Sequence, residues 1–356
     1  MKESGRKHWS KKRKIITWLF VGLLVLLGVV ALWINWNLNK VFHCGASCDE
    51  QAIITTAELK GEQDGRVNIL LAGDSTDDPD HGGANLTDSI MLVSIDTRGQ
   101  NSFMLSIPRD LWVNIPGWGH QKINAANDVS TFNEPGYPQG GMGQLEQIVE
   151  TDLGIPVDYY ALINYTAFRD MVNTVGGITI DIQSPDPRGI YDAFTGLSLP
   201  NGEVTLSGQQ ALDLARARGD DGAGDVSYGL PNSDFDRTEH QRQMLVALLQ
   251  KATTAGVLTN PERISALFSA VGSDVQTDIT LPDAKRLAQL AQRINPSKLQ
   301  SLTYPYGGAN GIITGYTDPI SGEDALVPKL GIDNFSQLQA YYQKYANAPE
   351  PVSTPN

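Results

Sequence analysis

The chain has 356 residues, which allows one large domain or two ordinary ones with a sizeable core. It carries 40 Asp and Glu against 27 Lys and Arg, a formal net charge of −13. This acidic balance argues against a general nucleic-acid binder, whose surface must be basic. The charge is uneven, because residues 1–14 carry a net +6 and the rest of the chain −19. Any basic binding site in the main body must therefore be local and concave.

A membrane anchor is predicted over residues 15–35. Within it, Ile15–Ile34 is a run of 20 residues without a charge, about the length that a helix needs to cross a bilayer. Because the basic block precedes this run, the positive-inside rule places residues 1–14 in the cytoplasm and the rest of the chain outside. The alternative is a cleaved signal peptide, but its apolar region would be unusually long and no A-x-A site follows it. The sequence therefore predicts a single-pass protein of the cell membrane.

Residues 36–66 are expected to form an extracytoplasmic stalk. They contain the only two cysteines, Cys44 and Cys48, and a disulfide between them is allowed outside the cytoplasm. Two free thiols fit the sequence equally, whereas two ligands alone make a poor metal site. The absence of any other cysteine excludes cysteine-based catalysis in the domain that follows.

A globular domain is predicted over residues 67–346. Short apolar runs indicate buried strands at Val67–Gly73, Asp88–Asp96, Ser102–Pro108, Tyr159–Tyr165 and Ile178–Ile182. Helical spacing and capping residues predict helices at Gly143–Leu153, Asp236–Ala255, Pro261–Val271, Pro282–Ile294 and Asp333–Ala346, and one ending near Gly176. Asp236, with Glu239 as its capping-box partner, and Asp333 are the expected N-caps. Alternating strands and helices predict an α/β fold, with a mixed central β-sheet covered by helices on both faces. The Pro-rich residues 347–356 are expected to be a disordered tail.

Two stretches rich in arginine indicate a site for an anion. "LDLARARGDD" places Arg216 and Arg218 two residues apart, and if residues 214–218 form a strand, both side chains point to one face of it. "DFDRTEHQRQML" places Arg237 and Gln241 on one face of a helix near its N-terminus, where unpaired N–H groups favour anions. Together they predict a phosphate clamp, because a guanidinium group binds two phosphate oxygens at once. The alternative is that each arginine pairs with a surface carboxylate.

Loops after predicted strands add polar side chains to this set. Arg109 directly follows Pro108 at the end of a strand, where an α/β sheet usually presents its site. The stretch "HQKINAA" adds Lys122 and Asn124. Each of these residues alone is a weak indication of a site, and only their combination supports one.

Eight motifs occur along the chain in the order "VNILLAG", "TDSIMLVSID", "MLSIPRDLWV", "KINAA", "LGIPVDYYALINYTAF", "VGGITIDI", "LSGQQALDLARAR" and "DFDRTEHQRQ". Taken together, they resemble the motifs of the LytR–CpsA–Psr family of bacterial cell-wall ligases. The resemblance covers roughly residues 67–249. The short basic tail, the single span and the outside domain fit the family too.

The resemblance implies an enzyme that transfers a glycopolymer, such as wall teichoic acid, capsule or arabinogalactan, from a polyprenyl-pyrophosphate carrier to peptidoglycan. It implies an apolar tunnel for the carrier's chain, between sheet and helices. The expected ligands of the pyrophosphate are Arg109, Lys122, Arg216, Arg218, Arg237 and Gln241. The expected catalytic residues are Arg109, Arg218, Arg237 and Asp234, and both Asp234 and Asp88 are candidates for the base.

The resemblance also implies Mg²⁺, with Mn²⁺ as an alternative, bound by two aspartates. Asp88, in "TDS", matches one of them directly. The other should follow the first strand, where members usually show Gly-x-Asp. Here the order is Gly73-Asp74-Ser75, so Asp74 is the candidate and Asp77 the alternative. An oxygen-only site of this kind suits Mg²⁺.

Two other departures from the family pattern concern the phosphate ligands. Leu86 and His240 stand at positions where many members have arginine. The inventory of ligands in this chain is therefore expected to differ from that of the family.

The reaction that the resemblance implies is an attack by a peptidoglycan hydroxyl on the sugar-side phosphorus, with polyprenyl phosphate as the leaving group. It requires neutralised phosphate oxygens and reacting atoms in line. A hydrolase that cuts the same pyrophosphate with water is one alternative function. A non-enzymatic, membrane-bound regulator that senses lipid carriers is another. DNA binding is disfavoured, because the domain is acidic and is expected on the other side of the membrane from the chromosome.

Overall fold

The computed structural model of the chain describes residues 58–77, 85–128, 140–219, 226–254, 256, 274–295 and 298–352. The predicted anchor over residues 15–35, both cysteines and the helix predicted at Pro261–Val271 lie outside these stretches. In the part of the chain that is described, no helix combines the length and the apolar character needed to span a bilayer.

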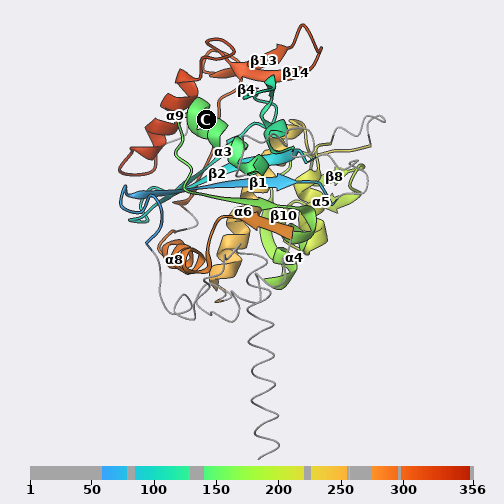
Figure 1. The fold of residues 1–356 in the computed structure, drawn as a ribbon. Helices are drawn as coiled ribbons and strands as arrows, with labels where there is room; N and C mark the ends of the chain where they lie inside the picture. The colour runs from blue at the N-terminus through green and yellow to red at the C-terminus, as the bar shows by residue number, and fades with distance from the viewer. Residues whose placement is uncertain are drawn as a thin grey trace, which may run out of the picture.

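A six-stranded mixed sheet forms the centre of the domain, in the order β11-β6-β1-β2-β3-β12 (Figure 1). Its strands are β1 (Arg66–Asp74), β2 (Thr87–Asp96), β3 (Phe103–Ile107), β6 (Tyr159–Ile163), β11 (Val275–Thr277) and β12 (Gln300–Thr303). β1 pairs parallel with β6 and antiparallel with β2, and β3 pairs antiparallel with β2 and parallel with β12. The carboxyl ends of β1, β3, β6 and β12 therefore share one edge, where α/β sheets usually bind ligands.

Helices cover both faces of this sheet. They are α3 (Gly140–Leu153), α4 (Tyr165–Thr174), α5 (Gly208–Arg216), α6 (Asp234–Thr254), α8 (Leu281–Ala291) and α9 (Ser336–Ala346). Because side chains alternate along a strand, Leu70 and Leu92 pack into a core under α3 and α9, whereas Ile69 and Ile95 pack against α8. Figure 1 shows α3 and α9 on one side of the sheet and α4, α6 and α8 on the other. The prediction of a mixed sheet with helices on both faces is confirmed.

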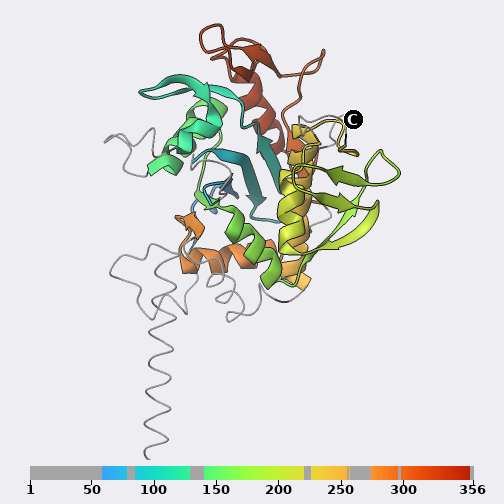
Figure 2. The ribbon, with the colours of Figure 1, turned by 90° about the vertical axis from the view of Figure 1, so that its right-hand side faces the viewer.

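A third core joins α4, α5 and α6 to two small sheets, β7–β10 and β8–β9. These strands are β7 (Ile178–Ile182), β8 (Ile190–Asp192), β9 (Leu197–Leu199) and β10 (Gly202–Leu206). Val172 of α4, Leu214 of α5 and Met244 of α6 are buried in this core. Figure 2 shows α6 between these small sheets and the central sheet, so α6 faces both.

Two hairpins and a short 3₁₀ helix complete the carboxyl edge. They are β4 (Trp112–Ile115) with β5 (Gly119–Lys122), β13 (Ile313–Thr317) with β14 (Asp324–Pro328), and η2 (Ile123–Asn127). The hairpins contact each other through the rings of Trp112 and Tyr316, whose centroids lie 6.3 Å apart. The amide of Leu326 donates to the carbonyl of Asp110 at 2.9 Å, so the second hairpin is attached beside Arg109.

The strand predicted over residues 214–218 is wrong, because this segment belongs to α5 up to Arg216. Ser207 and Gln210 form a reciprocal capping box at the start of α5, which satisfies two of its unpaired N–H groups. Ala211 and Leu214, three residues apart, are both buried, as expected for one face of a helix. The backbone is extended at Ala217, so Arg216 ends the helix and Arg218 lies in the segment that follows it.

Two predicted N-caps are also wrong. α6 begins at Asp234, and the carboxylate of Asp236 instead accepts from the amide of Asn232 at 2.7 Å. α9 begins at Ser336, and Asp333 pairs with His120 at 2.8 Å. Asp236 thus has its partner in the preceding loop, and Asp333 has its partner on a distant strand. Local sequence does not reveal either contact.

The folded unit extends past both predicted boundaries, residues 67 and 346. Leu59 is buried in the core beneath α8, because β1 is preceded by a turn that folds against it. At the other end, the amide of Val352 donates to Gln300 at 3.2 Å. The first part of the predicted tail thus packs against the edge strand β12.

Leu92 offers a test of the central core, because it is fully buried in the middle of the sheet. We expect Leu92→Ala to lower the free energy of unfolding by about 2–5 kcal/mol, through lost burial and the cavity left behind. Urea unfolding of the full chain in detergent measures this change. Leu330→Ala, at a position 56% exposed, is the matched control and should change stability by less than about 0.5 kcal/mol. Equal effects would contradict the assignment of the core.

Candidate functional site

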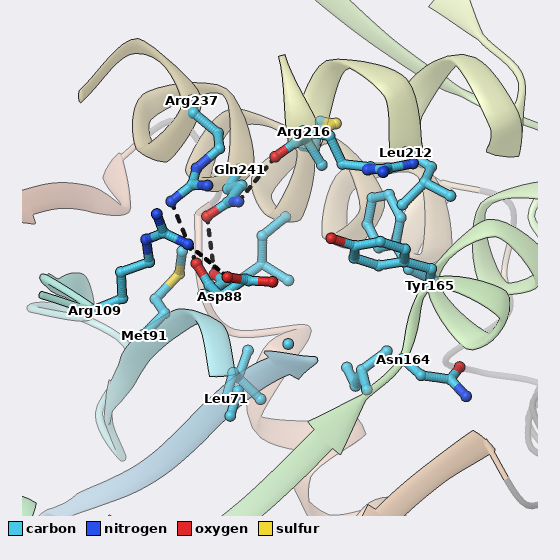
Figure 3. Close-up of a pocket in the computed structure, with 18 of the residues that line it drawn as sticks. Leu71, Asp88, Met91, Arg109, Asn164, Tyr165, Leu212, Arg216, Arg237 and Gln241 are labelled. Atoms are coloured by element: carbon cyan, nitrogen blue, oxygen red, sulfur yellow. Dashed lines mark hydrogen bonds and ion pairs between the residues drawn. The ribbon is translucent and has the colours of Figure 1, made fainter. Parts of the chain in front are cut away.

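An apolar cavity of about 720 Å³ opens between the sheet and α4, α5 and α6 (Figure 3). The sheet contributes Leu71 and Met91, which alternate with the residues that face the other core. The helices contribute Phe168, Met171, Leu212, Met244, Leu245 and Leu248. Such a lining suits a flexible hydrocarbon chain, because it offers dispersion contacts and almost no hydrogen-bonding groups.

A second cavity of about 590 Å³ adjoins the first at the carboxyl edge of the sheet. Five residues line both cavities: Asp88, Ser89, Arg109, Arg237 and Gln241. The second cavity is otherwise built from loops after β3 and β12, the start of α6 and the β13–β14 hairpin. The shared residues therefore form a charged junction between an apolar space and a more polar one.

Arg109 and Asp88 form the first part of this junction. Arg109 follows β3, and its Nη1 atom lies 2.6 Å from Oδ1 of Asp88 on β2. Burial lowers the pKa of Arg109, but the carboxylates of Asp110, Asp234 and Asp88 outweigh it and leave that pKa above its ordinary value. Oδ2 of Asp88 accepts from Ser75 at 3.0 Å, so its carboxylate is held from two sides.

Arg237 forms the second part, in the first turns of α6. Its side chain is nearly fully buried, and Nη2 lies 2.6 Å from Oδ1 of Asp234. Burial is the main reason that its pKa falls to about 10, and the nearby Arg218 and Arg109 lower it further, against the opposing effect of Asp234. Nε of Arg218 lies 3.6 Å from the same oxygen of Asp234. Arg218, which lines the apolar cavity, therefore adds a third guanidinium group beside the junction.

The junction contains buried donors that lack an acceptor at hydrogen-bond distance in the part of the chain that the structure describes. Among the described residues, the Nε atoms of Arg109 and Arg237 are buried and have no hydrogen-bond partner. Buried polar groups are nearly always paired in native proteins. Together with the mutual repulsion of the arginines, these donors favour an anionic ligand of high charge.

Gln241 and Asp192 fix the position of this cluster. Gln241 shares a face of α6 with Arg237, as predicted. Its Oε1 accepts from Ser89 at 2.9 Å and its Nε2 donates to the carbonyl of Ala215 at 3.0 Å, which ties β2, α6 and α5 together. Asp192, buried in β8, accepts from the amide of Arg218 at 3.0 Å. In this structure Gln241 thus holds the elements that carry the arginines in position.

Arg216 lies on a different wall of the apolar cavity. It ends α5, and its guanidinium group lies over the rings of Tyr165 and Phe194, at 5.0 and 5.5 Å from their centroids. Figure 3 shows it beside Tyr165, away from Arg109, Arg237 and Asp88. Both arginines of the "RAR" stretch line the cavity, but only Arg218 belongs to the cluster.

Lys122 is connected to the junction through the carboxylate of Asp110. Its ammonium group lies 3.3 Å from Oδ1 of Asp110, whose Oδ2 lies 3.8 Å from Nε of Arg109. It is not among the residues that line either cavity. Through this contact it can offset the charge of Asp110, which does line the second cavity.

The predicted metal aspartates lie on neighbouring strands. Asp74 ends β1 and pairs in register with Thr87, next to Asp88. Asp88 faces both cavities, whereas Asp74 is 6% exposed and accepts from the Thr76 hydroxyl at 2.7 Å. Among the described residues, no group of three or more Asp, Glu, His or Cys could hold a metal ion.

Asp77, the alternative metal ligand, has a structural role. It accepts from the amides of Tyr165 and Thr166 at 3.1 and 2.7 Å, at the start of α4. Burial raises the pKa of Asp77, but hydrogen bonds from Thr166 and Tyr165 outweigh it and leave that pKa below its ordinary value. Its carboxylate thus stabilises the N-terminus of a helix.

Sequence reasoning missed the aromatic partners of Arg216 and the whole second cavity. Tyr165 could have been found, because it follows the end of β6 by two residues, at the same edge of the sheet as Arg109. Phe194 lies in a tight β8–β9 turn, and the lining of the second cavity depends on the β13–β14 hairpin. Neither segment carried a motif that sequence alone could assign.

An apolar cavity that ends in a cluster of arginines fits an amphipathic ligand with an anionic group. The model of the LytR_cpsA_psr family matches residues 39–323 of this chain. The chain belongs to this family, as its motifs indicated.

Individual relatives support this assignment. The polyisoprenyl-teichoic acid–peptidoglycan teichoic acid transferase TagU of Oceanobacillus iheyensis is 31% identical over 89% of this chain and 90% of its own length. The solved structure of TagT bound to LI-WTA has a TM-score of 0.60 at 23% identity, over 86% of this chain and 100% of that one. TagT (YwtF) with bound octaprenyl pyrophosphate lipid has a TM-score of 0.55 at 22% identity, over 80% and 91%. At this identity the two structures establish the shared fold.

The lowered pKa of Arg237 gives the site a distinctive pH dependence. We expect the affinity for inorganic pyrophosphate to fall as the pH rises through about 10, when Arg237 loses its proton. Loss of one charge-assisted hydrogen bond should raise Kd by about 10- to 100-fold. Calorimetric titration of the full chain measures this change. Arg237→Gln should bind weakly at all pH values and lack the fall, and a flat wild-type affinity across pH 10 would contradict the assignment.

Proposed function

We propose that this chain is a transferase that moves a glycopolymer from a polyprenyl-pyrophosphate carrier to peptidoglycan. The observation that carries this proposal is the junction of three arginines at the end of an apolar cavity. The carrier's chain occupies the apolar cavity and its pyrophosphate lies among Arg109, Arg218 and Arg237. The TagU relative is named a polyisoprenyl-teichoic acid–peptidoglycan teichoic acid transferase, which supports the same assignment.

The arginines act by binding and neutralising the phosphate oxygens. Phosphoryl transfer needs the negative charge compensated and the attacking and leaving atoms held in line. A peptidoglycan hydroxyl attacks the sugar-side phosphorus, the bond from that phosphorus to the bridging oxygen breaks, and polyprenyl phosphate leaves along the apolar cavity. The donor's own pyrophosphate linkage supplies the driving force.

Asp234 is the proposed acceptor of the hydroxyl proton. It lines only the second cavity, and its side chain is 42% exposed. Asp88 is the weaker candidate, because Arg109 and Ser75 occupy its two oxygens. Asp234 also contacts Arg218 and Arg237, so it can hold the incoming hydroxyl next to the bound phosphate.

A Mg²⁺ ion, or Mn²⁺ in its place, is proposed as the cofactor. The donor chemistry fits, because Mg²⁺ in phosphate sites is often held by one or two carboxylates together with the substrate's phosphates. Asp88 would bind it directly, and Asp74 on the adjacent strand is the second candidate. The ion would supply additional charge compensation at the phosphate oxygens.

The proposal places the reaction outside the cytoplasm. Residues 15–35 would anchor the chain as a single span, with residues 1–14 inside and the α/β domain outside. This arrangement suits a donor whose lipid chain stays in the bilayer and an acceptor that lies in the cell wall.

Arg218 provides a direct test, because its side chain is the most exposed of the three arginines in the cluster. We expect Arg218→Ala to lower the transfer rate by about 10- to 100-fold, since it removes a hydrogen bond to a charged group. The assay uses the full chain in detergent, a polyprenyl-pyrophosphate-linked glycopolymer, peptidoglycan fragments and Mg²⁺. Arg98→Ala, at an exposed arginine paired with Asp96, is the matched control. Unchanged transfer by Arg218→Ala would refute the clamp.

The same assay separates the two alternative functions. Free glycopolymer phosphate as the product, with none joined to peptidoglycan, would identify a hydrolase. Tight binding of the lipid donor without any turnover would identify a sensor of lipid carriers.

The metal proposal is tested by chelation. We expect EDTA to lower the wild-type transfer rate by at least about 100-fold, and Mg²⁺ to restore it, because a bound cation contributes several kcal/mol of charge stabilisation. Asp88→Asn should lose most of both the rate and its response to Mg²⁺. Asp181→Asn, at an exposed carboxylate that accepts from Gln183, is the matched control. A wild-type rate that is insensitive to EDTA would exclude the cofactor.

A further inference from the structure

The second cavity holds features that binding a phosphate does not explain. Beyond the shared junction, its walls contain two exposed aromatic rings, Phe235 and Tyr306. They also carry carboxylate and hydroxyl groups from separate elements: Asp110, Thr303, Thr317 and Asp324. This mixture suits a ligand that presents an apolar face and also hydrogen-bonding groups.

Phe235 and Tyr306 lie together at this cavity. Their ring centroids are 5.6 Å apart with an interplanar angle of 47°, and the residues are 44% and 51% exposed. Phe235 directly follows Asp234 on α6, and Tyr306 follows β12 at the carboxyl edge of the sheet. The two rings lie together, and contiguous exposed apolar surface marks a binding site more often than single exposed residues do. The pair presents apolar surface within reach of the charged junction.

Gly315 keeps the space beside Tyr306 open. A Cβ atom at this position of β13 would lie 3.4 Å from the Tyr306 hydroxyl. A larger side chain would therefore extend into the cavity or displace the ring. The hairpin that carries Gly315 is fixed to the site by the Leu326 amide on Asp110, so this opening has a defined position.

The walls around the rings offer directional hydrogen bonds. Thr317 donates to Asp324 at 2.7 Å, which orients the Asp324 carboxylate. Asp110 is held by Lys122 at 3.3 Å. Carboxylates accept strongly from hydroxyl groups, and a sugar ring combines several hydroxyl groups with an apolar C–H face that can lie on an aromatic ring.

The position of the cavity agrees with this chemistry, an argument that rests on the proposed function. If the carrier's chain lies in the apolar cavity, the leaving oxygen points toward that cavity. An in-line attack then comes from the opposite side of the phosphorus, which is the side of the second cavity. The attacking group is a sugar hydroxyl.

We propose that the second cavity is a saccharide subsite in which Phe235 and Tyr306 hold a sugar ring and Asp110 and Asp324 bind its hydroxyl groups. The geometry favours the acceptor glycan as the occupant. The first sugar of the donor has the same chemistry and is the other source of such a ring.

The experiment measures binding and kinetics of the full chain in detergent. A peptidoglycan glycan oligomer is titrated calorimetrically into the wild type, Phe235→Ala and Tyr306→Ala. We expect each variant to weaken binding by about 3- to 10-fold, the size of one aromatic contact. Tyr306→Phe keeps the ring and should retain most of the affinity that Tyr306→Ala loses. Gly315→Val should weaken binding by filling the cavity while both rings remain.

Steady-state transfer then identifies the source of the sugar. A raised KM for the peptidoglycan oligomer with an unchanged KM for the lipid donor assigns the subsite to the acceptor. The reverse pattern assigns it to the donor's first sugar. Trp118→Ala, at an exposed aromatic residue outside both cavities, is the matched control and should match the wild type in both constants.

The outcomes also separate this inference from the proposed function. Unchanged glycan binding and unchanged KM values in Phe235→Ala and Tyr306→Ala overturn the subsite, even if the wild type transfers polymer. Glycan binding that is lost in these variants, in a wild type that shows no transfer, supports the subsite and refutes the transferase.

Discussion

The site depends on keeping several guanidinium groups charged and close together inside the protein. Arg237 is 4% exposed and lies near Arg109 and Arg218, an arrangement that burial and like-charge repulsion both oppose. Asp88 and Asp234 make it possible by contacting these arginines from the sheet and from α6. Among the described residues, they leave the Nε donors of Arg109 and Arg237 without a hydrogen-bond partner. The carboxylates therefore stabilise the charged cluster, while these two donors remain for an anionic ligand.

The elements around the cluster hold these charged groups in fixed positions. The carboxyl ends of four strands that run in one direction place Arg109 and the loop after β6 at a single edge. Gln241 joins α6 to β2 and α5 through one amide group, and Asp192 holds the backbone that presents Arg218. Rigid elements with buried polar contacts can hold charged groups within the tolerance that phosphoryl chemistry needs.

Much of this arrangement could be predicted from the sequence. The core strands and the mixed sheet follow from apolar runs, and Arg109, Arg218, Arg237 and Asp88 were found through motifs. The pairing of Arg216 with Arg218 on a strand was wrong, because the capping box at Ser207 and Gln210 favours a helix that ends between them. The two arginines line the same cavity through tertiary packing and not through strand alternation.

The second cavity could not be predicted, for a different reason. Its lining comes from elements that are distant in sequence, among them β2, β3, α6 and the β13–β14 hairpin. Its aromatic pair joins Phe235 to Tyr306, which are also far apart in the chain. Such contacts depend on how the β13–β14 hairpin docks on Asp110, which no local pattern encodes. The N-caps failed similarly, since Asp236 and Asp333 found partners outside their helices.

The apolar cavity has a consequence for the lifetime of the protein. Side chains such as Met91, Leu212 and Met244 face a space of about 720 Å³, so α4, α5 and α6 have fewer dispersion contacts there than in a filled core. A lipid chain that fills the space binds the folded state alone and raises its stability in proportion to the logarithm of its concentration. The abundance of the folded protein would thus follow the supply of its lipid, so that a cell short of carrier would also retain less of the protein that consumes it.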